Sequence, residues 1–240
     1  MPTRWPDLIK SKKMNGHLHP LSILMNQAME YFGKYGFEAV YGPEIATEQD
    51  NFDLLNIPKD HPSRDAHDTF YLKDGRLLRT HTSAMQIPVM SKRQPPVRLI
   101  FPGRVYRNEA TDPGHNTNFY QIEGLVIDKD VSLANLITTL KGLMQHLLKD
   151  EHLEFRIRPS YFPFVEPGIE LDMRRRNGEW MEILGAGMVH PQVLKNMNLD
   201  PDVWQGFAFG VGQERLLSIV TGLGDIRTNL SGDYRYLGQF

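Results

Sequence analysis

Polar side chains recur in pairs, two residues apart, within stretches of the sequence that read as strands. Successive side chains of a strand point to opposite faces of its sheet, so both members of such a pair share one face. They can converge on one ligand, although alternating polar residues more often mark the wet face of a strand. The pairs are His81 with Ser83, Arg107 with Glu109, and Gln121 with Glu123.

One carboxylate of these pairs has apolar neighbours. Glu123 lies among Ile122, Leu125 and Val126, where an ionised carboxylate is costly unless it has a partner. A cationic ligand would be such a partner, and so would an arginine of the same sheet. The residue types leave both readings open.

Two arginines suit the recognition of a polyphosphate. Guanidinium groups bind phosphate oxygens in a fork and stabilise charge that develops on phosphorus, which makes Arg107 and Arg215 candidates. Arg215 follows a strand and the glycines Gly210 and Gly212, which let the backbone approach a ligand before the next helix opens. Surface salt bridging is the alternative reading. The glycine spacing is not that of a dinucleotide-binding loop or a Walker loop, so both classes are disfavoured.

The elements that must position these residues follow from periodicity and turn residues. Apolar spacing predicts helices over 21–35 and 132–149 and a final helix over about 213–220, with Gly36 and Ser132 as stop and cap. The rest reads mostly as strands joined by turns, which implies an α+β fold with a mainly antiparallel sheet flanked by helices. The predicted strands cover 37–41, 76–82, 97–109, 119–128, 153–159, 180–185 and 207–210.

Length and composition indicate one ordinary globular domain. We expect an irregular arm over 1–15 and a single domain over 16–240. With 40% hydrophobic and 23% charged residues and no long apolar run, we expect no membrane association and a cytoplasmic location. The net charge of −2 argues against whole-surface binding of nucleic acid. The sequence has no cysteine, which excludes disulfides, thiolate zinc sites and a cysteine nucleophile.

Longer motifs surround these residues. They include GHLHPL at 16–21, GPEI at 42–45, NIP at 56–58, HDTFYL at 67–72, RTHTS at 79–83, PGRVYR at 102–107 and FYQIEG at 119–124. Further along are YFPFVEP at 161–167, GAGMVHP at 185–191, and GFAFG at 206–210 before Glu214-Arg215. Together they resemble the class II aminoacyl-tRNA synthetases, and specifically the α subunits of bacterial phenylalanyl-tRNA synthetases. The resemblance implies the class II catalytic fold, with motif 1 over 36–45, motif 2 over 102–124 and motif 3 over 206–215.

For ATP, the resemblance implies a bent triphosphate between two arginines. Arg107 would grip the α-phosphate, Arg215 would contact the γ-phosphate, and Phe119 would stack on adenine. Glu109 and His115 would line the same site. Mg²⁺ would bridge phosphate oxygens through carboxylates that the resemblance leaves unassigned.

For L-phenylalanine, the resemblance implies a polar end and an aromatic end. The carboxylate of phenylalanine would attack the α-phosphorus of ATP, and the acyl group would then pass to the terminal ribose of tRNA(Phe). The amino group would meet Gln121 and Glu123 with His81 and Ser83 nearby, Phe162 and Phe164 would form the wall for the ring, and Ala186 and Gly187 would leave room at its far end.

The family also implies partners, and three departures from its pattern bear on them. A larger β subunit and self-association through motif 1 are expected. The coiled-coil arm that normally precedes the catalytic domain is replaced by a short segment before Gly16, which bears on tRNA binding. Tyr120 stands in place of the usual imidazole and the loop 111–115 differs, and neither threatens adenylate formation. The alternatives are a free-standing paralogue that makes an adenylate for a non-tRNA acceptor, and a catalytically silent regulatory subunit.

Overall fold

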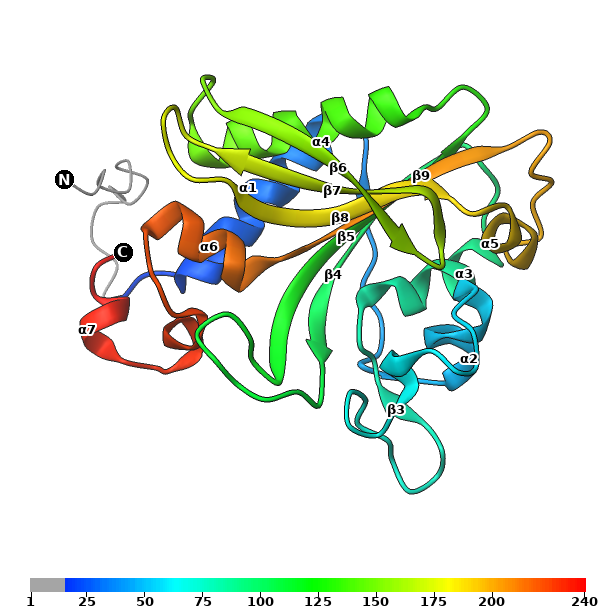
Figure 1. Ribbon diagram of the computed structural model, residues 1–240, viewed down its shortest axis with the longest axis horizontal. Helices are drawn as coiled ribbons and strands as arrows, with labels where there is room; N and C mark the ends of the chain where they lie inside the picture. The colour runs from blue at the N-terminus through cyan, green and yellow to red at the C-terminus, as the bar shows by residue number, and fades with distance from the viewer. Residues whose placement is uncertain (1–15) are drawn as a thin grey trace.

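The computed structural model describes residues 16–240 (Figure 1), and the arm predicted over 1–15 lies outside these residues. Its framework is a seven-stranded sheet in which β1 and β4 are parallel and all other neighbours are antiparallel. The predicted α+β fold with a mainly antiparallel sheet is therefore confirmed. In sheet order the strands are β1 (Glu38–Ala39), β4 (Val97–Tyr106), β5 (Asn118–Asp128), β9 (Gln205–Gly212), β8 (Met181–Val189), β7 (Val165–Arg174) and β6 (Glu154–Phe162).

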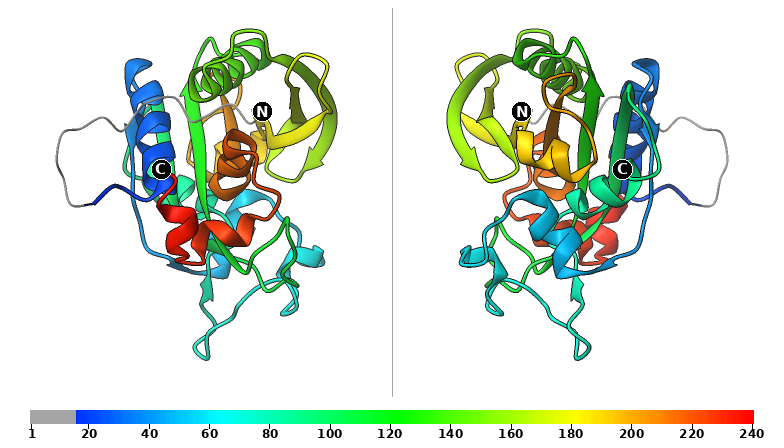
Figure 2. Two further views of the ribbon diagram at one scale, coloured as in Figure 1. Left: turned by 90° about the vertical axis from the view of Figure 1, so that its left-hand side faces the viewer. Right: turned by 90° about the vertical axis from the view of Figure 1, so that its right-hand side faces the viewer.

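Three helices, α1 (Pro20–Lys34), α4 (Leu133–Leu148) and α6 (Gln213–Thr221), lie on one face of the sheet (Figures 1 and 2). The predicted stop and cap are both present, because Gly36 has a φ of 77° after α1 and Ser132 forms a capping box with Asn135 at the start of α4. These three helices confirm the helices expected from periodicity.

Short elements cover the opposite face of the sheet. They are α2 (Glu48–Asn51), α3 (Gln86–Met90), α5 (Pro191–Asn196), the 3₁₀ turns η1 (Asp53–Leu55), η2 (Pro62–Arg64) and η3 (Thr82–Met85), and a two-stranded sheet of β2 (Ile45–Ala46) and β3 (Leu77–Leu78). The chain ends with η4 (Ile226–Leu230) and α7 (Tyr234–Leu237).

Strand alternation divides the core into two layers. In β5, Ile122 and Val126 belong to the cluster under the long helices, whereas Leu125 and Ile127 belong to the cluster under the short elements. We call these the helix face and the opposite face. Because side chains alternate, Gln121 and Glu123 emerge on the opposite face with Leu125.

One strand prediction was wrong, and one strand was missed. The segment predicted as a strand over 76–82 contains only β3, and η3 begins at Thr82. Arg79 explains the difference, because its buried guanidinium donates to the carbonyls of Gly42, Pro43 and Arg104 and so ties the segment to two others. The long strand β7 was not predicted at all.

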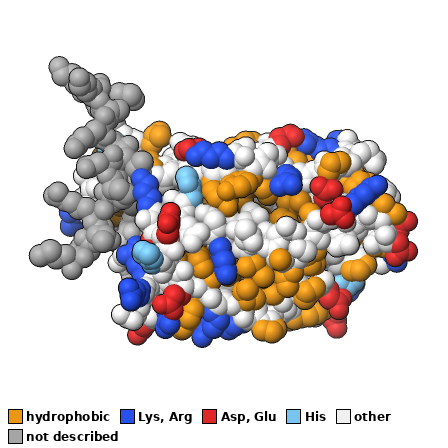
Figure 3. Space-filling view, turned by 90° about the horizontal axis from the view of Figure 1, so that it is seen from above, with side chains coloured by type: hydrophobic (Ala, Val, Ile, Leu, Met, Phe, Trp, Pro, Cys, Tyr) orange, Lys and Arg blue, Asp and Glu red, His pale blue; other side chains and the backbone are white. Residues whose placement is uncertain are grey.

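The surface shows no sign of a dominant charge over the face seen from above, where basic and acidic side chains are interspersed with apolar ones (Figure 3). Within residues 16–240, no helix is long and apolar enough to cross a bilayer.

Candidate active site

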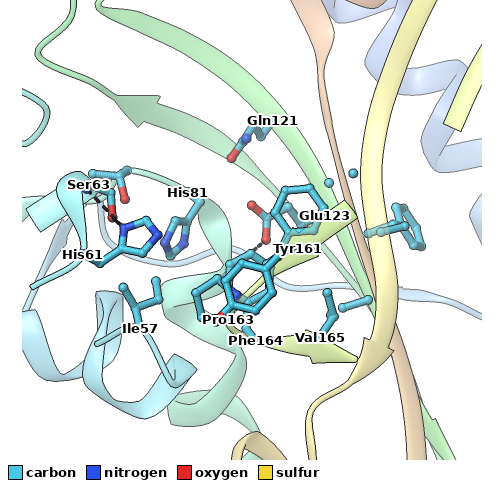
Figure 4. Close-up of a pocket in the computed structure, with 18 of the residues that line it drawn as sticks. Ile57, His61, Ser63, His81, Gln121, Glu123, Tyr161, Pro163, Phe164 and Val165 are labelled. Carbon is cyan, nitrogen blue, oxygen red and sulfur yellow. Dashed lines mark hydrogen bonds between the residues drawn. The ribbon is translucent and has the colours of Figure 1, made fainter. Parts of the chain in front are cut away.

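A cavity of about 590 Å³ opens on the opposite face of the sheet, within the range typical of small-molecule sites. Its floor comes from β5, β8 and β9, and its walls come from the segments around His61, His81 and Phe162. Figure 4 shows His81, Gln121 and Glu123 around one shared space, with Tyr161 and Phe164 beside it. Segments that are distant in the sequence therefore meet here.

The carboxylate of Glu123 is buried in the cavity floor and held by neutral donors. The backbone N–H of Thr82 donates to Oε1 at 3.1 Å, and the hydroxyl of Ser83 donates to Oε2. Burial raises the pKa of Glu123 to about 7, although the bonds from Ser83 and Thr82 and the charge of Arg107 oppose this shift. Among the ion pairs of the described residues, none involves Glu123, so the arginine partner considered from the sequence is not present.

Within residues 16–240, three buried polar atoms of the cavity wall have no side-chain hydrogen-bond partner. They are Oε1 of Gln121 and both ring nitrogens of His81. Burial, with smaller contributions from the charges of Arg107 and Arg79, lowers the pKa of His81 to about 3, so its ring is neutral. Buried polar atoms without hydrogen bonds cost free energy, and a polar ligand group would remove that cost.

The pair His81 and Ser83 does line the cavity, but not as two residues of a strand. Ser83 lies in η3 and His81 precedes it as the N-cap. The same qualification applies to Arg107 and Glu109, which line the cavity just beyond the end of β4. Only Gln121 and Glu123 share a face through strand alternation as predicted.

Aromatic rings and small residues form the apolar end of the cavity. Phe162 and Phe164 stack with centroids 5.9 Å apart and an interplanar angle of 22°. Gly185 lies under them, since a Cβ there would come within 2.7 Å of the Phe162 ring. Ala208 of β9 lines the same space and belongs to the opposite-face cluster.

The expectation for Ala186 and Gly187 requires a correction. Ala186 does line the cavity, but it pairs with Phe209 and both belong to the helix-face cluster, so its methyl group points away from the aromatic slot. Gly187 does not line the cavity, and a Cβ there would lie 2.7 Å from Cβ of Val165. Gly187 therefore makes room for Val165, and the small residues that border the slot are Gly185 and Ala208.

Arg107 and Phe119 form a second feature at the cavity edge. The guanidinium of Arg107 lies over the Phe119 ring, 5.1 Å from its centroid, and its Nε donates to the carbonyl of Thr80 at 3.4 Å. Gly212 lies beside the Phe119 ring, and a Cβ there would be 3.9 Å from it, an ordinary contact distance. An aromatic ring and a guanidinium at one edge suit a base and a phosphate group.

Besides Gly187 and Phe119, two more predicted residues do not line the cavity. Arg215, on α6, borders a second hollow of about 510 Å³, and its Nη1 is 3.9 Å from Oε1 of Glu182. His115 is exposed in the loop after β4, where its Nδ1 is 3.0 Å from both carboxylate oxygens of Asp112. Arg107 thus lines the cavity, whereas Arg215 and His115 lie outside its lining.

Two carboxylates of the site were not predicted from the sequence. Glu170 and Glu182 both line the cavity, and Glu182 also borders the second hollow. A usable signal was present, because Ile169, Leu171 and Met173 alternate with Glu170 and Asp172 as in a half-buried strand.

These carboxylates are compatible with a magnesium ion that arrives with a polyphosphate. Within residues 16–240, no cluster of three or more His, Cys, Asp or Glu side chains is arranged to hold a metal. Mg²⁺ is often bound by one or two carboxylates together with phosphate oxygens and water. Glu182 and Glu170 both line the cavity, and each is also paired with Arg158.

Comparisons with known proteins agree with the geometry. Residues 7–240 match the family described as tRNA synthetases class II core domain (F). The chain is 50% identical over 226 residues to the phenylalanine–tRNA ligase alpha subunits of Pectobacterium carotovorum and Proteus mirabilis, covering 94% of this chain and 68% of each relative. The crystal structure of pyrrolysyl-tRNA synthetase from Desulfitobacterium hafniense shares the fold, with a TM-score of 0.71 and 18% identity over 91% of this chain and 75% of that one.

Proposed function

The chain belongs to the phenylalanine–tRNA ligase α-subunit family of class II tRNA synthetases, and we propose that it activates L-phenylalanine with ATP to form phenylalanyl-adenylate. The observation that carries the proposal is the pairing of unsatisfied polar atoms with an aromatic slot in one cavity. A free amino acid with an apolar ring has the complementary shape, because its ammonium group and its ring lie at opposite ends.

The polar end suits an ammonium group. Glu123 supplies a carboxylate without a cationic partner, and Oε1 of Gln121 is an unsatisfied acceptor. Neutral His81 supplies one further acceptor nitrogen without adding a competing positive charge. Binding of the ammonium group would therefore satisfy atoms that are otherwise buried without partners.

The apolar end suits an unsubstituted phenyl ring. Phe162 and Phe164 offer faces and edges for ring packing, and Ala208 and Gly185 border the space without a polar side chain. A tyrosine hydroxyl would be buried there without a partner, at a cost on the order of 2 kcal/mol, besides any steric clash. We therefore expect activation of phenylalanine in strong preference to tyrosine.

Activation needs no nucleophile from the protein. An oxygen of the phenylalanine carboxylate attacks the α-phosphorus of ATP, a new P–O bond forms, and pyrophosphate leaves with the electron pair of the broken bond. Arg107 stabilises the negative charge that develops on the α-phosphate, and Phe119 holds the adenine. Mg²⁺, held by Glu182 and Glu170 with phosphate oxygens, would neutralise charge on the pyrophosphate. We further propose that Arg215 contacts the γ-phosphate end once the nucleotide is bound.

The names of the relatives point to a second step and a partner. We propose that the acyl group passes to tRNA(Phe) and that this transfer depends on a β subunit. Self-association through motif 1 is part of the same proposal.

The direct test is ATP–pyrophosphate exchange with each amino acid, followed by charging of tRNA(Phe) with and without a candidate β subunit. We expect phenylalanine to support exchange, and tyrosine to support it at least about thirtyfold less well, which corresponds to the estimated cost of the unpaired hydroxyl. Equal exchange with both amino acids would contradict the pocket assignment, and no exchange with any amino acid would contradict the proposed function.

A further inference from the structure

An ion-pair network crosses the outer three strands of the sheet beside the cavity. Arg158 of β6 lies at its centre. Its Nη2 is 2.7 Å from Oε2 of Glu170 and 3.1 Å from Oε2 of Glu182, and its Nε donates to Oδ2 of Asp172 at 2.8 Å. One guanidinium thus bridges carboxylates on both β7 and β8.

Asp172 anchors this network to the sheet. It is buried, with 1% of its surface exposed, and it accepts hydrogen bonds from Arg156 as well as Arg158. A buried carboxylate with two charged donors has little freedom to move. The buried carboxylate of Asp172 therefore fixes the position of Arg158. Arg158 in turn fixes the positions of the more exposed Glu170 and Glu182.

Glu182 extends the network to α6. Its Oε2 is taken by Arg158, and its other oxygen, Oε1, lies 3.9 Å from Nη1 of Arg215. The contact with Arg215 is long, and both side chains are about half exposed, at 54% and 46%. An exposed ion pair of this kind contributes little free energy, so Arg215 can leave Glu182 for another partner. Arg215 is thus held near the second hollow but remains available to a phosphate group.

We propose that Arg158, anchored on Asp172, is a positioning residue for Arg215 and acts through Glu182. The inference rests on the proposed function, since it assigns Arg215 to the triphosphate of ATP. Without Arg158, both oxygens of Glu182 become available to Arg215, and a closer pair with Arg215 would hold it away from the nucleotide. Phenylalanine binding should be unaffected, because Glu123 and Gln121 take no part in this network.

Arg156 offers a matched control. It lies on the same strand two residues away and binds the same oxygen of Asp172, but its guanidinium contacts Asp172 and the Trp180 ring rather than Glu182. Arg156→Met therefore removes an equally exposed cation and one ion pair to Asp172 while leaving the link to Arg215 in place.

The first experiment measures equilibrium binding of Mg·ATP and of phenylalanine separately, alongside pyrophosphate exchange, with the full chain. Arg158→Met should weaken ATP binding about tenfold, a typical coupling between residues in one network, and leave phenylalanine binding unchanged. Arg156→Met should change both by less than about twofold. Arg158→Lys should resemble Arg158→Met, because an ammonium group cannot bridge the three carboxylates as a fork does. Because Arg158→Lys keeps the positive charge, it can replace Arg158→Met in the experiment if Arg158→Met fails to fold.

The second experiment is a double-mutant cycle with Arg215→Met. If Arg158 acts through Arg215, the double variant Arg158→Met/Arg215→Met should bind ATP no more weakly than Arg215→Met alone. Two results would contradict the proposal that Arg158 positions Arg215, while leaving the proposed activation by ATP intact. One is that the losses of ATP binding add in the double variant. The other is that Arg158→Met binds ATP as well as Arg156→Met does. If Arg215→Met binds ATP with the affinity of the wild type, Arg215 does not contact the triphosphate. The proposal that Arg158 positions it would then also be wrong.

Discussion

At the scale of single residues, Glu123 combines burial with an unusual protonation behaviour. Burial raises the pKa of its carboxyl to about 7, because it outweighs the stabilising bonds from Ser83 and Thr82. An ammonium ligand binds the ionised form. The protonation state of this one side chain should therefore control the binding of phenylalanine near neutral pH.

We predict that the dissociation constant for phenylalanine rises as the pH falls below about 7, approaching tenfold per pH unit, because one proton then competes with the ligand. His81, whose pKa is about 3, stays neutral over this range and adds no second dependence. Isothermal titration between pH 5.5 and 8.5 measures the effect. Glu123→Gln should bind weakly at every pH with a flat profile, and a profile as steep as that of the wild type in this variant would assign the proton to another group.

Of the two arginines assigned to ATP, Arg107 lines the cavity and Arg215 does not. We predict that Arg107→Ala lowers the rate of phenylalanine-dependent exchange by about two to three orders of magnitude, as expected for loss of a charge-assisted contact to the transition state. Arg174, which pairs with Glu154 on the outer strands, is the control, and its replacement should have little effect. If the two variants ranked in the opposite order, the assignment of Arg107 would be wrong.

The aromatic slot gives a prediction in which two alanines behave differently. Ala208→Gly removes a methyl group from the wall of the slot and should admit para-chlorophenylalanine, because a site of this kind resolves about one methyl group. Ala186→Gly removes a methyl group from the helix-face core and should lower stability without widening substrate choice. Exchange assays with the analogue separate the two cases. Broader specificity from Ala186→Gly alone would contradict the register of β8 and β9.

At the scale of elements, Glu214 joins the start of α6 to β5. Both carboxylate oxygens accept from the backbone N–H of Tyr120 at 3.0 Å, and burial raises the pKa of Glu214 to about 7. Tyr120 lies between Phe119 and Gln121 on β5. The contact therefore holds in place the part of β5 that carries the Phe119 ring and the Gln121 amide. The contact therefore couples motif 3 to motif 2.

We predict that Glu214→Ala lowers the free energy of unfolding by about 1–3 kcal/mol, since the N–H of Tyr120 loses its acceptor. Glu214→Gln keeps an acceptor oxygen and should cost less. The folded state holds the Glu214 proton more tightly than the unfolded state, so the contribution of this group falls as the pH rises from about 4.5 to about 7 and is then constant. Urea unfolding at pH 5 and pH 8 tests both points, and Glu214→Gln should show less of this decline than the wild type.

At the scale of the whole molecule, the apolar stripe of α1 does not need a partner. Leu21, Leu24 and Ala28 pack into the helix-face core, so the stripe is covered within the chain itself. Exposed apolar side chains lie instead just before motif 1, at Tyr35, and within it, at Tyr41. Tyr35 and Tyr41 are 55% and 70% exposed. Such surface is typical of a contact region.

We predict that the purified chain self-associates weakly through this surface and charges tRNA(Phe) at least about tenfold more slowly alone than with a β subunit, because its net charge of −2 gives no general attraction to RNA. Sedimentation at several concentrations and aminoacylation assays provide the measurements. Tyr41→Glu should shift the chain toward monomer while phenylalanine-dependent exchange continues. A chain that stays monomeric and charges tRNA at the full rate by itself would overturn this prediction.

The sequence by itself determined the features that depend on neighbours along the chain. Helical spacing defined α1, α4 and α6, and two-residue alternation placed Gln121 and Glu123 on one face of β5. These patterns are readable because hydrophobic periodicity and caps act within a few residues. The motifs around them were sufficient to predict the family that the comparisons then showed.

The tertiary structure decided which groups actually meet. Ala186 and Ala208 both stand in small-residue motifs, and only the register that pairs Ala186 with Phe209 and Gly187 with Ala208 shows which methyl group faces the slot. His81 and Ser83 reach the cavity because buried Arg79 ties their segment to Gly42, Pro43 and Arg104. The bridge from Asp172 through Arg158 and Glu182 to Arg215 joins three strands and a helix. Register and long-range ion pairs depend on residues far apart in the chain, so no local pattern encodes them.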